Sequence, residues 1–127
     1  MKMEQFQKDY LHIRVMIDFA EEIGRTLEKV KKLPLDFSDE MVISSLAMHI
    51  GQIGEQLDRQ KLSVELQEEY ADIIPWSHIK RFRDKAYHHY SRMDGSDILK
   101  IATQEIPNLL DGLYKIKRDL EQHLREF

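Results

Sequence analysis

The spacing of apolar residues is the feature of this 127-residue sequence that most constrains its fold. Over almost the whole chain, apolar side chains recur every three or four residues, which is the repeat of an α-helix with one buried face. No run shows the alternation of β-branched and polar residues that is typical of a strand. The sequence therefore predicts an all-α protein, and we expect an antiparallel bundle of about four to five helices in one domain over residues 1–127.

Capping and breaking residues divide the first part of this pattern. Apolar residues from Phe6 to Val30 predict one long helix, which Pro34 ends. Ser38 is the predicted N-cap of a second helix, and the apolar stripe of that helix covers residues 43–57. The two helices are thus separated by a short connection.

Prolines mark the later elements. Between Asp58 and Asp72 we expect a short amphipathic helix with Val64, Leu66 and Tyr70 on its apolar face. Pro75 opens the next helix, because proline is well tolerated in a first turn. The last helix carries an apolar stripe over residues 98–124. Pro107 lies inside that stripe and cannot donate to the carbonyl of Thr103, so we predict a kink there.

Two glycines, Gly51 and Gly54, lie within the second predicted helix. A glycine inside a helix costs about 1 kcal/mol relative to alanine, so a pair indicates that another backbone packs very close to this helix. Neither glycine follows a strand, which argues against a phosphate-binding glycine loop.

Charge is distributed unevenly along the chain. The net charge of −4 argues against a nucleic-acid-binding protein with a simple basic coat. Residues 76–92 nevertheless carry five basic side chains and one acidic one, whereas residues 55–72 carry six acidic and two basic ones. Either the basic segment is an anion site on an acidic body, or the two segments neutralise each other as packed neighbours.

Several classes of protein are excluded or disfavoured. The absence of cysteine removes thiol nucleophiles and thiolate metal sites, and the six histidines match no common ligand pattern, so we expect no metal and no cofactor. No stretch approaches the roughly 20 apolar residues that a membrane span requires, and the first five residues are polar where a signal peptide would be basic and then apolar. We expect a cytoplasmic protein that does not bind membranes.

The segment from residue 81 to residue 90 has the densest functional composition. Guanidinium and ammonium groups can hold a phosphodiester, and imidazole can transfer a proton at neutral pH. These are the parts of a metal-free ribonuclease, in which a base removes the proton of a ribose 2′-hydroxyl and the oxygen attacks the adjacent phosphorus. The alternative is an ordinary basic amphipathic helix with histidines on its surface.

The spacing of Arg83, His88 and Tyr90 resembles the Arg-x-x-x-x-His-x-Tyr signature of HEPN domains, in particular the HepT-like toxins encoded beside a minimal nucleotidyltransferase antitoxin. The Ile-Gly-Glu element of that family is matched by residues 53–55, and its Ile-Pro-Trp element by residues 74–76. The family's Asp after the signature and its internal Ile-Pro step are matched by Asp94, Ile106 and Pro107. The similarity therefore extends over nearly the whole chain.

The resemblance implies a homodimer with two copies of the signature around one cleft, which cleaves RNA without a metal and is silenced by the nucleotidyltransferase antitoxin. Carried over, Arg83 would bind the scissile phosphate and His88 would be the general acid or base. Tyr90 would support the site and is the candidate acceptor of AMP transferred by the antitoxin.

Helical geometry constrains how the signature can work. At about 100° per residue, Arg83 and Tyr90 lie on nearly the same face, whereas His88 points about 140° away from Arg83. Either the helix frays or turns near His88, or Arg83 of one subunit works with His88 of the other. We prefer the dimer.

Further side chains complete the predicted site. Arg81, Lys85 and Arg92 lie on one face with His88 and are the predicted RNA-binding track. Asp84 is expected to orient Arg83.

Three cleft candidates keep two interpretations each. Tyr87 narrows the cleft or stacks a base, or else it caps the core of the dimer. His89 supplies a second imidazole or is a surface residue. Glu55 lies near the cleft or is an exposed helix carboxylate.

Two other functions compete with the ribonuclease toxin. One is a non-catalytic HEPN subunit that positions nucleotide or RNA for a nucleotidyltransferase, and the other is a purely structural helical interaction domain. The ribonuclease is favoured because a binding role gives no reason for His88, and a structural role explains none of the signature.

Overall fold

The structure is a computed structural model that describes the backbone of residues 2–92 and 95–126 and the side chains of residues 3–88 and 95–126. These residues form helices and connections but no strand, which confirms the all-α prediction. The elements are α1 (Lys2–Lys31), α2 (Glu40–Glu55), α3 (Val64–Glu69), α4 (Trp76–Arg92), α5 (Ser96–Lys100), a π-helical turn (Ile101–Glu105) and α6 (Ile106–Arg125).

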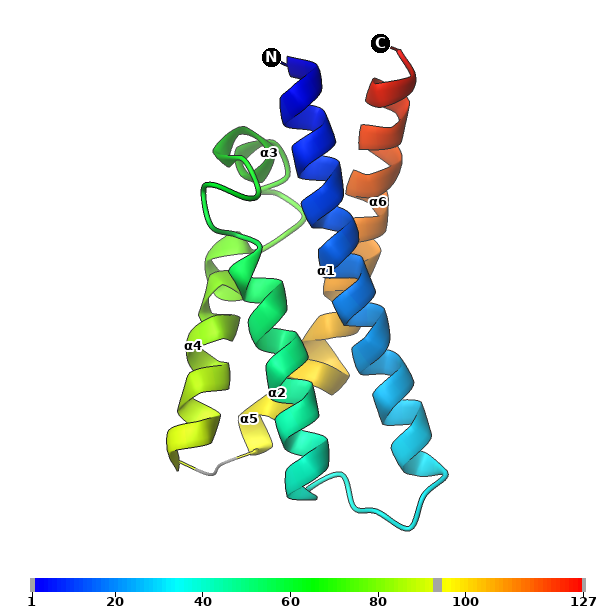
Figure 1. The fold of residues 1–127 in the computed structure, drawn as a ribbon, viewed down its shortest axis with the longest axis vertical. Helices are drawn as coiled ribbons and strands as arrows, with labels where there is room; N and C mark the ends of the chain where they lie inside the picture. Colours follow the sequence, from blue (N-terminus) through cyan, green and yellow to red (C-terminus); the bar gives the residue numbers. More distant parts are fainter. Residues whose placement is uncertain (1, 93–94, 127) are drawn as a thin grey trace.

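The long helices run alternately up and down, as Figure 1 shows. Helix α2 packs against both α1 and α4, and α1 packs against α6. The segment formed by α5 and the π-helical turn contacts α2 and leads into α6. Each long helix contributes apolar side chains that are fully buried, among them Ile13, Ile50, Phe82 and Leu113. The predicted antiparallel bundle is confirmed.

The start of α2 differs from the prediction. The N-cap is Asp39, whose carboxylate accepts a hydrogen bond from the backbone N–H of Met41 at 2.9 Å. Ser38 instead donates its own backbone N–H to the carboxylate of Asp36 at 3.0 Å, so it belongs to the preceding turn. The prediction that Ser38 caps α2 is wrong by one residue.

The third helix is short, as expected, but Val64 is not on its buried side. Ser63 caps α3 by accepting a hydrogen bond from the N–H of Leu66. Val64 is the first residue after this cap and is exposed, whereas Leu66 and Tyr70 are buried.

The break expected at Pro107 takes the form of a π-helical turn. This turn ends immediately before α6, in which Pro107 occupies the first turn and needs no N–H partner. The chain changes direction between α5 and α6 (Figure 1). The wider π turn thus accommodates the break in the helical hydrogen-bond pattern that proline causes.

The two glycines of α2 face α4. A Cβ atom added to Gly54 would lie 2.9 Å from the backbone nitrogen of Arg83, and one added to Gly51 would lie 3.1 Å from the Cβ of Ala86. The prediction of a closely packed neighbouring backbone is confirmed. The consequence is that the first residue of the signature lies at the point where α2 and α4 approach most closely among these contacts.

Helix α6 is tied to the rest of the bundle by tyrosine hydroxyls. Tyr10 of α1 donates to Glu121 at 2.8 Å, and Tyr114 donates to Glu21 of α1 at 2.6 Å. Tyr70, at the end of α3, donates to Asp119 at 2.7 Å.

Candidate functional site

Helix α4 carries most of the predicted site residues and has one buried face. Ile79, Phe82 and Ala86 are buried in the core. The remaining circumference displays the charged and polar residues of the segment to solvent: Arg81, Arg83, Asp84, Tyr87 and His88 are exposed, and Lys85 is half-buried. The helix therefore exposes its charged and polar side chains to solvent, and Phe82 packs in the core.

Arg83 is the site residue with the best-defined surroundings. Its Nε lies 3.1 Å from Oε2 of Glu55 on α2, and its guanidinium carbon lies 5.9 Å from the centre of the Tyr87 ring. The second carboxylate oxygen of Glu55 lies 3.9 Å from Nζ of Lys61. Glu55 is thus a direct neighbour of Arg83, and it is half-buried rather than exposed.

The backbone is helical beyond His88. Helix α4 continues to Arg92, so the fraying or turn near His88 that would bring Arg83 and His88 together within one chain is absent. At about 100° per residue, the two side chains leave the helix about 140° apart. Within one copy of the described chain, Arg83 and His88 cannot face the same phosphate.

Three predicted residues have side chains outside the part that the structure describes. The backbone of His89, Tyr90 and Arg92 belongs to α4, and their position on the helix follows from that alone. Asp94 lies wholly outside the described residues.

The two oppositely charged segments pair at one place in the described part of the chain. Arg83 and Glu55 form the ion pair between them, whereas Arg81 and Lys85 form no ion pair with any described residue. Mutual neutralisation of the segments is therefore limited, and cationic side chains remain available along α4.

One contact of α4 was not predicted. His78 of α4 pairs through Nε2 with Glu105 at the end of the π-helical turn, and its ring meets the edge of Phe82 at 6.0 Å between centroids. The two residues are 27 positions apart, and no local sequence signal announces such a pair. This contact joins the start of α4 to the segment that precedes α6.

Exposed apolar side chains border the Arg83 region. Met41 and Met48 of α2 are 80% and 53% exposed, and Tyr87 of α4 is 64% exposed. Met41, Met48 and Glu55 are spaced by seven residues, which places them on one face of α2. The two exposed methionines thus lie on the same face of α2 as Glu55, with polar residues between them.

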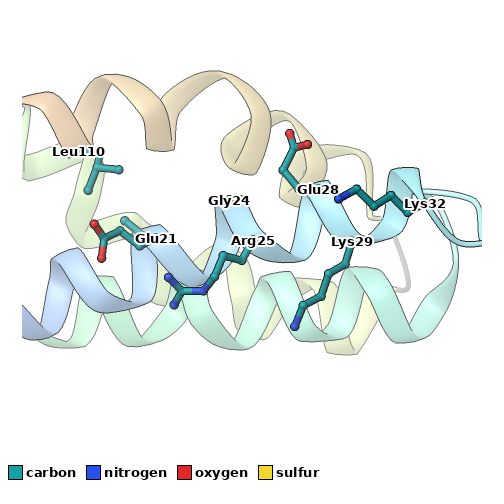
Figure 2. A pocket seen from close by; sticks show the side chains of 8 residues that line it. Glu21, Gly24, Arg25, Glu28, Lys29, Lys32 and Leu110 are labelled. Carbon is teal, nitrogen blue, oxygen red and sulfur yellow. The ribbon is translucent and has the colours of Figure 1, made fainter.

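A hollow of about 670 Å³ lies elsewhere, between α1 and α6. Figure 2 shows its charged side chains on α1 and, for Lys32, on the residue just after that helix, with Leu110 of α6 also in the lining. Acidic and basic side chains are mixed along it, and no residue of α4 contributes to it. The hollow is therefore separate from the signature.

Among the described residues, no three histidine or carboxylate side chains come together as metal ligands would. None of the described helices combines the length and apolar character that crossing a bilayer demands.

The comparisons with known proteins give one match. The family model described as "Ribonuclease HepT-like" matches residues 1–116. No curated protein matches the chain. No solved structure matches it either.

Proposed function

Because this chain belongs to the HepT-like ribonuclease family, we propose that it is a metal-independent endoribonuclease and the toxin of a toxin–antitoxin pair. Its substrate is RNA, and its site contains Arg83, His88 and Tyr90. The observation that carries the proposal is the arrangement of Arg83 and His88 on opposite sides of one continuous helix, with Arg83 held by Glu55.

The chemistry follows from the side chains. A base removes the proton of the ribose 2′-hydroxyl, the 2′-oxygen bonds to phosphorus, and the bond to the 5′-oxygen breaks as that oxygen takes a proton from an acid. The products are a 2′,3′-cyclic phosphate and a 5′-hydroxyl. His88 exchanges the protons, and Arg83 stabilises the charge that builds on the phosphate oxygens. DNA lacks the nucleophile and is not cleaved.

Two copies of the chain complete the site. Since Arg83 and His88 diverge by about 140° on one helix, Arg83 of one subunit and His88 of the other converge on a shared phosphate. A symmetric pair contains two such composite sites, each with Arg83 of one subunit and His88 of the other. The exposed side chains of Met41 and Met48 on α2 and of Tyr87 on α4 support this self-association, because apolar side chains of that size are commonly covered in an interface.

The cations along α4 hold the rest of the RNA. Arg81 and Lys85 lie on the flank of α4 that also carries His88, and Arg92 continues that row by its position. These residues contact backbone phosphates and make binding dependent on salt.

A minimal nucleotidyltransferase is the proposed antitoxin, and it transfers AMP from ATP to the hydroxyl of Tyr90, with release of pyrophosphate and of the hydroxyl proton. Tyr90 lies seven residues after Arg83 and so on nearly the same face of α4. An added phosphodiester with a nucleoside would place an anion and considerable volume where the substrate phosphate binds. Inhibition follows from charge repulsion and steric exclusion.

The proposal is tested by cleavage of total cellular RNA in EDTA, with the purified protein and its His88→Ala variant side by side. We expect the wild type to leave 2′,3′-cyclic phosphate ends and the variant to lose at least about 100-fold in rate, as removal of a general acid or base does. RNA affinity should change little, because Arg83, Arg81 and Lys85 remain.

Two results would contradict this function. Cleavage by neither protein, from a dimeric preparation unmodified at Tyr90, would indicate the non-catalytic subunit of a nucleotidyltransferase. Full activity of a monomer would contradict the shared site while leaving the ribonuclease in place. A pH–rate profile without a limb near the pKa of imidazole would argue against His88 as the proton carrier.

A further inference from the structure

Glu55 contacts Arg83 at the inner nitrogen of the guanidinium. The carboxylate oxygen Oε2 lies 3.1 Å from Nε. The two outer nitrogens of a guanidinium form the fork that matches two phosphate oxygens. A carboxylate at Nε therefore contacts the arginine beside its stem, at the end of the planar group nearest the backbone.

A second cation and an aromatic ring lie close to the Glu55–Arg83 pair. The other oxygen of Glu55, Oε1, faces Nζ of Lys61 at 3.9 Å, so each oxygen of the carboxylate faces a different base. The ring of Tyr87 lies one helical turn beyond Arg83, with its centre 5.9 Å from the guanidinium carbon. Arg83 is therefore restrained along its stem and beside its planar group.

The fold places Glu55 for this role through the preceding residue. Gly54 has no side chain, and even a Cβ there would lie 2.9 Å from the nitrogen of Arg83 and 3.2 Å from the carbonyl oxygen of Ile79. The two backbones can approach this closely only because of that glycine. The next residue, Glu55, then reaches the side chain of Arg83.

We propose that Glu55 is the positioning residue for Arg83, and that it orients the guanidinium toward the scissile phosphate without touching the RNA itself. The proposal rests on the ribonuclease function given above. It assigns the two parts of the Ile-Gly-Glu element distinct tasks: Gly54 allows the helices to meet, and Glu55 aims the arginine.

A positioning role and a merely structural ion pair predict different kinetics. In Glu55→Ala, Arg83 loses this contact, so kcat should fall about 10- to 100-fold. KM should stay equal or fall, because a negative charge near the RNA has been removed. In Glu55→Gln, an amide oxygen on a side chain of the same length can still face Nε, so kcat should stay within about threefold of the wild type.

The chain offers a matched control. Glu22 accepts from Nε of Arg25 at 2.8 Å on α1, and the exposed fractions of this pair, 36% and 57%, are close to those of Glu55 and Arg83, 31% and 54%. Glu22→Ala breaks an equivalent Arg–Glu pair far along the sequence from α4. Its kcat and KM should equal those of the wild type.

A spectroscopic measurement adds a result independent of turnover. The Nε–Hε resonance of Arg83, assigned by its absence in Arg83→Lys, should be shifted and slow to exchange in the wild type and in Glu55→Gln. It should move toward the position of a solvated arginine in Glu55→Ala, while far-ultraviolet circular dichroism stays unchanged.

The outcomes separate this proposal from the function on which it rests. A wild type that cleaves no RNA overturns both. If the wild type is active and Arg83→Ala is inactive, the function stands, and an unchanged kcat in Glu55→Ala overturns the positioning role alone. Equal losses of kcat in Glu55→Ala and Glu55→Gln would also overturn it, because an oxygen facing Nε would then not be sufficient to position the arginine.

Discussion

The two pairs of long helices in the bundle are held together by different means. Between α1 and α6, tyrosine hydroxyls and carboxylates satisfy each other, as in Tyr10–Glu121 and Tyr114–Glu21. Between α2 and α4, backbones meet at a glycine, and the charged residues of α4 point outward. One pair uses its polar groups for structure, and in the other most charged residues of α4 face solvent.

This difference bears on the proposed chemistry. Arg81 and Lys85 have no ion-pair partner among the described residues, and Arg83 pairs with Glu55. The hollow between α1 and α6 carries charges of both signs. A phosphodiester is attracted by uncompensated cations rather than by volume, which is why the functional surface is proposed on α4.

The largest change in stability is expected where α2 meets α4. Gly54→Ala should lower the free energy of unfolding by about 2 kcal/mol, because overpacking costs about 1–3 kcal/mol and alanine recovers at most about 1 kcal/mol of helix propensity. Cleavage should fall too, since Arg83 and Ile79 lie at the contact. Urea denaturation at a fixed protein concentration measures the first effect.

Gly51→Ala is the control for that experiment. Its new methyl group would meet the Cβ of Ala86 at 3.1 Å rather than a backbone nitrogen, so the loss of stability should be smaller. A Gly54→Ala variant as stable as the wild type would show that α4 can shift outward freely, and the contrast between the two helix pairs would then disappear.

Much of the fold could be predicted because it depends on local patterns. The 3.6-residue repeat marked every long helix, and Gly51 and Gly54 indicated a close backbone before any partner was known. The prediction of Ser38 as the N-cap failed because Asp39 next to it has an equally suitable side chain, and tertiary context decides between neighbours.

The parts that could not be predicted depend on contacts between distant residues. Tyr10 and Glu121 are 111 positions apart, and neither is unusual in its local sequence. The same holds for Glu55 and Arg83, where the sequence left a cleft residue and an exposed carboxylate as equal alternatives. The signature itself was identified by resemblance. The contact between Glu55 and Arg83 could be found only from the packing of α2 on α4.

A smaller loss is expected on the α6 side. Tyr70→Phe should lower the free energy of unfolding by about 1.5 kcal/mol, because a buried hydroxyl that donates to Asp119 at 2.7 Å is removed. RNA cleavage should not change, since no site residue is involved. Tyr87→Phe, an exposed tyrosine of α4, serves as the stability control and should match the wild type. Loss of cleavage in Tyr70→Phe would indicate that α6 communicates with the site.

Replacement of a third helical glycine, Gly24, should increase the stability of the protein. A Cβ added to Gly24 of α1 would have nothing within 4 Å, so Gly24→Ala should stabilise the protein by about 1 kcal/mol through helix propensity alone. The melting temperature should rise by about 3–5 °C at equal protein concentration. A fall in the melting temperature would mean that the native packing does not tolerate a side chain at Gly24. The α1–α6 side of the bundle would then resemble the α2–α4 side, where glycine is needed for close packing.

The smallest predicted effect is the pH dependence of the stability that the tyrosine–carboxylate hydrogen bonds of α6 provide. The hydrogen bond from Tyr70 lowers the pKa of Asp119, and that from Tyr10 lowers the pKa of Glu121. A carboxylate whose pKa is lower in the folded state stabilises it fully above the unfolded pKa and loses this contribution as the pH falls through the folded pKa. In urea midpoints, the difference between the wild type and Tyr70→Phe should therefore shrink between about pH 5 and about pH 2. A difference that stays constant over that range would contradict the assignment, because the Tyr70–Asp119 bond would then be indifferent to the charge of its acceptor.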